Sequence, residues 1–271
     1  MEESIENFIK RKNNFTESRE GHNLHVFDRL VTIDGVDGSG KDTISEYLLK
    51  KMKERFGEEN VIQIDVTHFK DNEGRVTGLG ERVFGDNGQD GYFNVRNGAK
   101  KINNQELFDL KDQQIDKAFI AGVNRAYTEK VIPALESGKI VIIPRSELNL
   151  LRFALQENNK EKIDREIKYL LDGTTTSGII AGNRIFVHVN PVDMLRNIEM
   201  RGNRTDLDPK DIQDAETFVK TQSEAEDFFT GLSSDKEVNF IRVENNTVDT
   251  KDIKNHMEKL CENIINSLVL E

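Results

Sequence analysis

Five short apolar runs, each rich in β-branched residues, alternate along the chain with longer segments whose apolar residues recur at helical spacing. After the first run, for example, Ile44, Leu48 and Met52 are spaced to share one face of a helix. Strands that alternate with helices in this way predict parallel strands joined by right-handed crossovers. We therefore predict an α/β fold with five parallel strands, at 30–33, 61–66, 140–143, 185–189 and 240–243.

The two ends of the chain differ in pattern from the middle. Residues 1–23 are mostly polar, with a small apolar patch of Ile5, Phe8 and Ile9 that predicts a short amphipathic helix. We place an N-terminal extension at 1–28 and one domain at 29–271. A last amphipathic helix is expected at about 250–269, with Cys261 beside its apolar stripe in a packing role, and 85–101 is interpreted as a surface loop or insertion.

Composition and charge narrow the classes of protein. With a single cysteine among 271 residues, no disulfide can form within the chain, which suits a cytoplasmic protein. The net charge of −11 disfavours nucleic acid as a partner, because most of the surface would repel a phosphodiester backbone. No apolar run is long enough to span a bilayer, and charged residues open the chain, so we expect neither membrane insertion nor secretion.

The strongest chemical motif is GVDGSGK at 35–41, between the first predicted strand and the first predicted helix. It satisfies the glycine, four residues, glycine, lysine pattern of a phosphate-binding P-loop (Walker A). Glycines let backbone N–H groups converge on phosphate oxygens, and the helix N-terminus adds the positive end of its dipole. A purely structural glycine-rich loop is the alternative. The predicted nucleotide-binding residues are Gly35, Asp37, Gly38, Ser39, Gly40, Lys41, Asp42 and Thr43.

The residue after Lys41 departs from the pattern. A serine or threonine normally stands there and its hydroxyl binds Mg²⁺, but this chain has Asp42, with Thr43 next. A carboxylate is also a good ligand for a hard cation, so we predict that Asp42 holds Mg²⁺. The competing interpretation is that Asp42 repels the triphosphate and marks a site that has lost activity.

The chain from about Arg29 to Val269 resembles the thymidylate kinase family. The loop at 35–41 reproduces the family's form, Phe69 and the RVTGLG segment at 75–80 resemble the block after its second strand, and the stretch from Arg125 to Arg145 is similar in both residue type and spacing. The resemblance implies a P-loop NTPase-type three-layer α/β/α fold with a small helical lid, and transfer of the ATP γ-phosphoryl group to a deoxynucleoside monophosphate. It also implies ATP and Mg²⁺ as cofactors and pairing as a homodimer.

The resemblance carries over a set of substrate and lid residues. It implies that the arginines at 75, 125 and 145 bind the acceptor phosphate, and three guanidinium groups near the strand ends suit a phosphate dianion. Gln156 and Phe69 are the expected substrate contacts besides these arginines. The lid is expected at about 199–212, where Arg201 and Arg204 would act on the transferring phosphoryl group with Lys41 and Arg145. The alternatives are surface ion pairs for single arginines, a solvated basic turn for the lid, and an exposed helical position for Gln156.

Two further positions depart from the family. Pro144 replaces an aspartate that helps to organise Mg²⁺, and Ala121 replaces a phenylalanine that stacks on the base, with Phe119 two positions earlier. The choice of base therefore stays open. Isolated histidines indicate no zinc site, and we expect His188, within an apolar run, to be a hydrogen-bonded core residue.

The predicted function is a nucleoside monophosphate kinase that phosphorylates dTMP or a related nucleotide. Two alternatives remain. One is a polyphosphate-dependent nucleotide kinase, a related group that also tolerates a residue without a hydroxyl after the P-loop lysine. The other is a lapsed relative that binds nucleotide without turnover, as the changes at Asp42 and Pro144 suggest.

Overall fold

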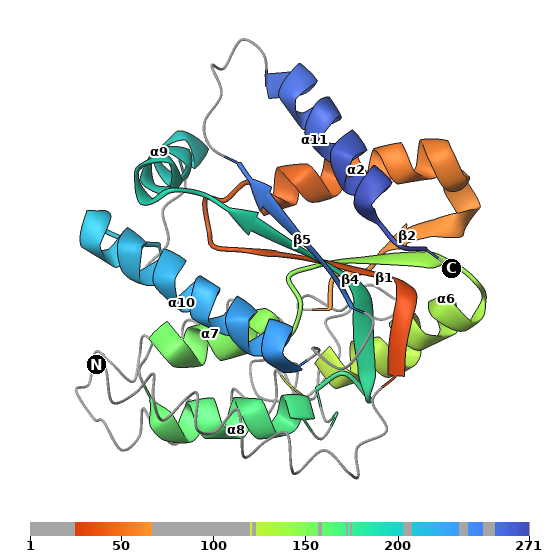
Figure 1. The fold of residues 1–271 in the computed structure, drawn as a ribbon, viewed down its shortest axis with the longest axis horizontal. Helices are drawn as coiled ribbons and strands as arrows, with labels where there is room; N and C mark the ends of the chain where they lie inside the picture. Colours follow the sequence, from red (N-terminus) through yellow and green to blue (C-terminus); the bar gives the residue numbers. More distant parts are fainter. Residues whose placement is uncertain are drawn as a thin grey trace.

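The computed structural model describes residues 25–66, 120, 123–156, 159–171, 173, 175–202, 208–232, 238–245 and 253–270. They form a five-stranded sheet in the order β2-β3-β1-β4-β5, in which every neighbouring pair is parallel. The prediction of an α/β fold with five parallel strands is confirmed (Figure 1). The strands are β1 (His25–Gly35), β2 (Val61–Gln63), β3 (Ile140–Pro144), β4 (Ile179–His188) and β5 (Asn239–Glu244).

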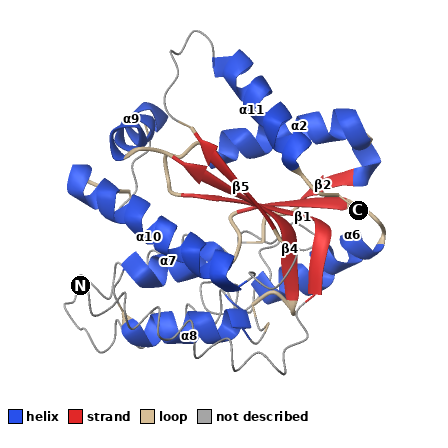
Figure 2. Cartoon of the chain, viewed as in Figure 1, coloured by secondary structure: helices blue, strands red, loops and turns tan. Residues whose placement is uncertain are grey.

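Helices cover both faces of the sheet, so the domain has three layers (Figure 2). One face carries α2 (Lys41–Phe56) and α11 (Ile253–Ser267). The other carries the π-helical turn η3 (Tyr127–Val131), α6 (Ile132–Glu136), α7 (Leu148–Gln156), α8 (Lys160–Leu171) and α10 (Ile212–Leu232). A short η1 (Glu58–Asn60) leads into β2, and α9 (Pro191–Arg201) follows the end of β4.

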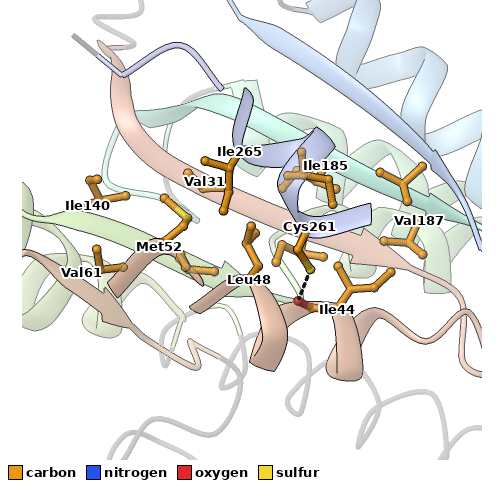
Figure 3. Close-up of a cluster of buried hydrophobic side chains, with 14 of the residues drawn as sticks. Val31, Ile44, Leu48, Met52, Val61, Ile140, Ile185, Val187, Cys261 and Ile265 are labelled. Carbon is orange, nitrogen blue, oxygen red and sulfur yellow. Dashed lines mark hydrogen bonds between the residues drawn. The ribbon is translucent and has the colours of Figure 1, made fainter. Parts of the chain in front are cut away.

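Because successive side chains of a strand point to opposite faces of the sheet, each strand contributes core residues to both faces. In β1, Val31 and Ile33 pack on the side of α2 and α11, whereas Leu30 packs on the opposite side, toward η3 and α6. Figure 3 shows the cluster of buried side chains between the sheet, α2 and α11. In it, Cys261 of α11 lies against α2, and its Sγ is 3.8 Å from the backbone oxygen of Ile44. The packing role predicted for Cys261 is confirmed.

Two strands begin earlier than the apolar runs predict. β1 begins at His25, which pairs with Ile179, so residues 25–28 belong to the sheet although we assigned them to the extension. β4 begins at Ile179, earlier than the predicted run, and the part before that run includes the buried polar residues Asn183 and Arg184. Asn183, for instance, donates to the backbone oxygens of Asp28 and Val269. Polar residues just before the predicted runs, Asp28 and Arg29 in β1 and Asn183 and Arg184 in β4, interrupt the apolar pattern and conceal the earlier apolar residues of both strands.

Some predictions lie outside the described residues, namely the helix at 1–23 and the loop at 85–101. The last helix ends at Ser267, two residues earlier than expected. In the part of the chain that the structure describes, no helix has the length and apolar character that a bilayer crossing requires.

Candidate functional site

The loop at 36–40 connects β1 directly to α2, as the motif predicts. Gly38 and Gly40 have φ angles of +81° and +83°, a left-handed conformation that residues with a Cβ rarely adopt. Crowding adds a second reason for glycine, since a Cβ on Gly40 would lie 2.3 Å from Nδ2 of Asn245. The Ser39 N–H donates to the backbone oxygen of Val36 at 3.1 Å and closes the turn. The glycines of the motif are therefore required by this loop conformation.

Lys41, the first residue of α2, is buried and lies against the loop. Its ammonium group donates to the backbone oxygen of Val36 at 3.3 Å and to Oδ1 of Asp37 at 3.2 Å. Burial lowers the pKa of Lys41, and the charge of Asp37 opposes that shift. Asp37 has a pKa lowered to about 2: burial raises it, but the positive charges of Lys41, Arg152 and Arg145 outweigh burial. Three cations therefore act on one carboxylate in the loop.

Arg145 lies where β3 ends beside the loop. Its backbone N–H donates to the oxygen of Ile33 in β1 at 3.0 Å, next to the paired residues Ile33 and Pro144. Its φ is +68°, which is strained for a residue with a side chain. The guanidinium group donates to Oδ2 of Asp42 at 2.9 Å. The structure therefore brings together the predicted residues Lys41, Asp42 and Arg145.

The donor chemistry bears on the magnesium predicted at Asp42. One carboxylate oxygen of Asp42 is engaged by Arg145, while the side chain is more than half exposed. Among the described residues, no group of three or more His, Cys, Asp and Glu side chains is placed to hold a metal. Mg²⁺ in nucleotide enzymes is commonly held by one or two carboxylates together with substrate phosphates. Asp42 fits that arrangement through its second oxygen.

A buried carboxyl group, Asp34, lies directly behind the loop and was missed by the sequence analysis. It is fully buried, and it accepts hydrogen bonds from the backbone N–H of Ser146 at 2.8 Å, the Ser146 hydroxyl at 2.7 Å and the Asn149 amide at 3.3 Å. Burial raises its pKa to about 6, against the lowering effect of the Ser146 hydrogen bond. These contacts attach the end of β1 to the turn before α7. The sequence did contain a signal for this buried acid, because Asp34 stands between the apolar run at 30–33 and Gly35.

A second buried group of charges includes Glu147, the residue after Ser146, and its charge acts on Asp34. Arg184 of β4 forms an ion pair with Glu147, and both side chains are almost completely buried. Glu147 also accepts a hydrogen bond from the Tyr127 hydroxyl, and the Arg184 guanidinium lies 4.5 Å from the ring centroid of Phe229. Arg152 of α7, also buried, lies 6.0 Å from the ring of Phe218. The sequence analysis missed these charges because periodicity places no charged residue in a core.

Some predicted site residues have partners away from the loop, and others lie outside the described residues. Arg125 pairs with Glu129 one turn along its own helix at 2.6 Å, and Arg201 pairs with the buried Asp208 at 2.7 Å. Gln156 is the last residue of α7. Thr43 is exposed in the first turn of α2. Phe69, Arg75 and Arg204 lie outside the described residues.

His188 lies at the end of β4 and is only partly buried, so the core position predicted for it is wrong, whereas its contact with a carboxylate agrees with the predicted hydrogen bond. Its Nε2 lies 2.9 Å from Oε2 of the buried Glu226 in α10. This hydrogen bond raises the pKa of His188, with burial acting in the opposite direction.

The fold resembles that of two solved kinase structures, although no protein-family model matches the sequence. A deoxyadenosine kinase from M. mycoides, solved with bound dCTP, is 14% identical with a TM-score of 0.51, covering 88% of this chain and 99% of that one. A thymidylate kinase from Ehrlichia chaffeensis is 17% identical with a TM-score of 0.47, covering 88% of this chain and 97% of that one. The chain thus shares its α/β fold, with a five-stranded parallel sheet, with the deoxyadenosine kinase structure.

Proposed function

We propose that this protein is a P-loop phosphotransferase that moves the γ-phosphoryl group of ATP to a nucleoside monophosphate, dTMP or a related nucleotide. The observation that carries the proposal is the pair of cations beside the glycine-rich loop, at the carboxyl ends of β1 and β3: the buried Lys41 lies 3.2 Å from Asp37, and Arg145 lies 2.9 Å from Asp42. Ligands of open α/β sheets bind at this edge. Because buried cations cost solvation energy unless an anion compensates them, such a group of charges suits a polyphosphate.

The residues of the loop would act by positioning and electrostatics. Backbone N–H groups of the loop and the N-terminus of α2 bind phosphate oxygens. Lys41 exchanges its contacts with Val36 and Asp37 for the β- and γ-phosphates, and Arg145 stabilises the charge on the transferring group. Mg²⁺, when bound with ATP, neutralises phosphate charge, and Asp42 is its proposed protein ligand.

The acceptor side of the proposal rests on the sequence resemblance. Arg75, Arg125 and Arg145 would bind the acceptor phosphate, with Phe69 and Gln156 as further substrate contacts. Arg201 and Arg204 would cover the ATP phosphates from the lid. For this, Arg125 and Arg201 must leave their present partners, Glu129 and Asp208. The homodimer implied by the resemblance also stays a prediction.

A second candidate is a nucleotide-binding protein without turnover. The ion pair between Asp42 and Arg145 favours it, since a carboxylate engages an arginine that the reaction requires. Pro144, in place of a carboxylate, points the same way.

The test is a coupled phosphoryl-transfer screen with ATP and Mg²⁺ against the common ribo- and deoxynucleoside monophosphates, with polyphosphate as an alternative donor. Turnover that disappears in Lys41→Ala but persists in Lys50→Ala, an exposed position of the same helix, would support the kinase. Nucleotide binding without product at any acceptor would instead support the second candidate. Absence of both binding and turnover would contradict the proposal as a whole.

Asp42 is tested separately with Asp42→Asn, which keeps the shape of the side chain and removes its charge. If Asp42 is a magnesium ligand, the Mg²⁺ concentration for half-maximal ATP binding rises, by roughly ten-fold for one lost ligand contact. An unchanged Mg²⁺ requirement would contradict the metal role and leave Asp42 as a partner of Arg145.

A further inference from the structure

Two asparagine side chains from distant parts of the chain hold the carbonyl groups of the P-loop from outside. Asn197 of α9 donates from Nδ2 to the backbone oxygen of Gly38 at 2.8 Å. Asn245, the residue after β5, donates from Nδ2 to the backbone oxygen of Ser39 at 2.7 Å. We propose that Asn197 and Asn245 are positioning residues for the loop: Asn245 turns the Ser39–Gly40 peptide so that the Gly40 N–H faces the phosphate, and Asn197 holds the preceding peptide, whose Ser39 N–H closes the turn onto Val36. This inference rests on the proposed function.

The geometry of the peptide group links these contacts to phosphate binding. In a planar trans peptide, the C=O of one residue and the N–H of the next point in opposite directions. Holding the Gly38 carbonyl toward α9 therefore turns the Ser39 N–H into the loop, where it donates to Val36. In the same way, holding the Ser39 carbonyl toward Asn245 turns the Gly40 N–H inward. Gly40 immediately precedes α2, where an anion at the helix N-terminus would accept this N–H.

Asn245 is itself held firmly in place. Its side chain is buried, and its backbone N–H donates to the oxygen of His188 at 2.9 Å, so β4 fixes its position. The amide lies so close to the loop that a Cβ on Gly40 would be 2.3 Å from it. Gly38 is similarly enclosed, since a Cβ there would lie 2.7 Å from the backbone oxygen of Met194 in α9. The loop is thus shaped by α9 and the end of β5 as well as by its own glycines.

Preorganised donors bind an anion without first paying for reorientation. Asn245→Ala removes the amide, and Asn245→Asp replaces the donor with a carboxylate that faces a carbonyl oxygen. Both leave the Ser39–Gly40 peptide free to rotate. We expect roughly ten-fold weaker phosphate binding from Asn245→Ala, the effect of about one hydrogen bond, and a larger loss from Asn245→Asp.

The chain offers a matched control at the other end of β5. Asn239 also uses its amide to join separate segments, donating to Oδ1 of Asn183 at 2.9 Å and to the backbone oxygen of Ser267 at 2.6 Å. Asn239→Ala removes the same kind of side-chain contact, but far along the strand from the P-loop. A general loss of stability would affect both variants, whereas loss of loop orientation would affect only the Asn245 variants.

The experiment measures tripolyphosphate and ADP binding by calorimetry for the full chain and its variants, with thermal midpoints recorded alongside. ¹⁵N-glycine labelling follows the Gly40 amide, which we expect to shift on addition of tripolyphosphate in the wild type and to shift less in Asn245→Ala. Support would be weaker binding in Asn245→Ala with Asn239→Ala within about two-fold of the wild type, the scatter expected of a neutral change. Equal binding in wild type and Asn245→Ala, or equal losses in both alanine variants, would overturn the inference.

If the Asn245 variants do not fold, Asn197→Ala decides in the same assay: weakened binding supports the proposal and wild-type binding overturns it. A wild-type chain that binds neither probe would overturn the proposed function and this inference with it. Wild-type binding that Asn245→Ala leaves unchanged would overturn the inference alone.

Discussion

Replacing Asp34 by asparagine should stabilise the protein at neutral and alkaline pH. Asp34 is fully buried, and burial raises its pKa from 3.8 to about 6. Because the folded pKa lies above the unfolded value, the stabilising effect of the protonated form is complete below about 3.8 and is lost as the pH rises through about 6. Asparagine resembles the protonated acid and carries no charge at any pH.

The magnitude follows from the shift of roughly two pKa units. At about 1.36 kcal/mol per unit, ionisation of Asp34 costs the folded state about 3 kcal/mol by pH 8, and about 1 kcal/mol of this is already lost at pH 4.5. The advantage of Asp34→Asn should therefore grow by about 2 kcal/mol between these pH values. Asparagine can still accept from the Ser146 N–H and can donate to its hydroxyl. Any weakened hydrogen bond would lower stability by about 1 kcal/mol at every pH.

The assay is urea-induced unfolding of both proteins at half-unit pH intervals from 4.5 to 8. Glu136→Gln, at an exposed position of α6, controls for the loss of a carboxylate at the surface. The diagnostic quantity is the difference in unfolding free energy between wild type and variant as a function of pH. A difference that stays flat, or that changes in the opposite direction, would show that Asp34 is not held as a desolvated acid behind the loop.

Three further predictions concern the core and its rim. Leu48→Ala, in the fully buried cluster between α2 and the sheet, should lower the unfolding free energy by about 3 kcal/mol in urea titrations, and a loss under 1 kcal/mol would contradict the packing. The Cys261 thiol is fully buried, and burial raises its pKa to about 11, so a thiol reagent at pH 8 should label it only after denaturation; rapid labelling of the native protein would contradict this. The hydrogen bond to Glu226, together with the charge of Glu244 and against burial and the charge of Arg242, raises the pKa of His188. Its stabilising effect is therefore present below about 6.5 and lost as the pH rises through the higher folded value. NMR titration should show that higher pKa in the wild type and a lower one in Glu226→Gln, and identical midpoints would exclude the ion pair.

The candidate site was predictable where its chemistry is local in the sequence. The loop at 35–41 needs glycines at particular positions between a strand and a helix, and these are neighbours along the chain. Arg145 was predicted from the family resemblance, with its place near a strand end as support, and the sheet brings it to Asp42, 103 positions away. The partners of Arg125 and Arg201 required the structure, because an arginine in a sequence indicates charge but not which carboxylate will meet it.

The sequence by itself determined the five strands of the described sheet, the position of the glycine-rich loop and the packing of Cys261, since all three follow from short-range periodicity or from a contiguous motif. Only the tertiary structure decided the strand order β2-β3-β1-β4-β5, the buried acid Asp34 behind the loop, and the two amides of Asn197 and Asn245 that hold it from outside. Each of these depends on groups distant along the chain. The free-energy cost of burying the polar side chains is offset by hydrogen-bond partners that become neighbours only when the sheet assembles.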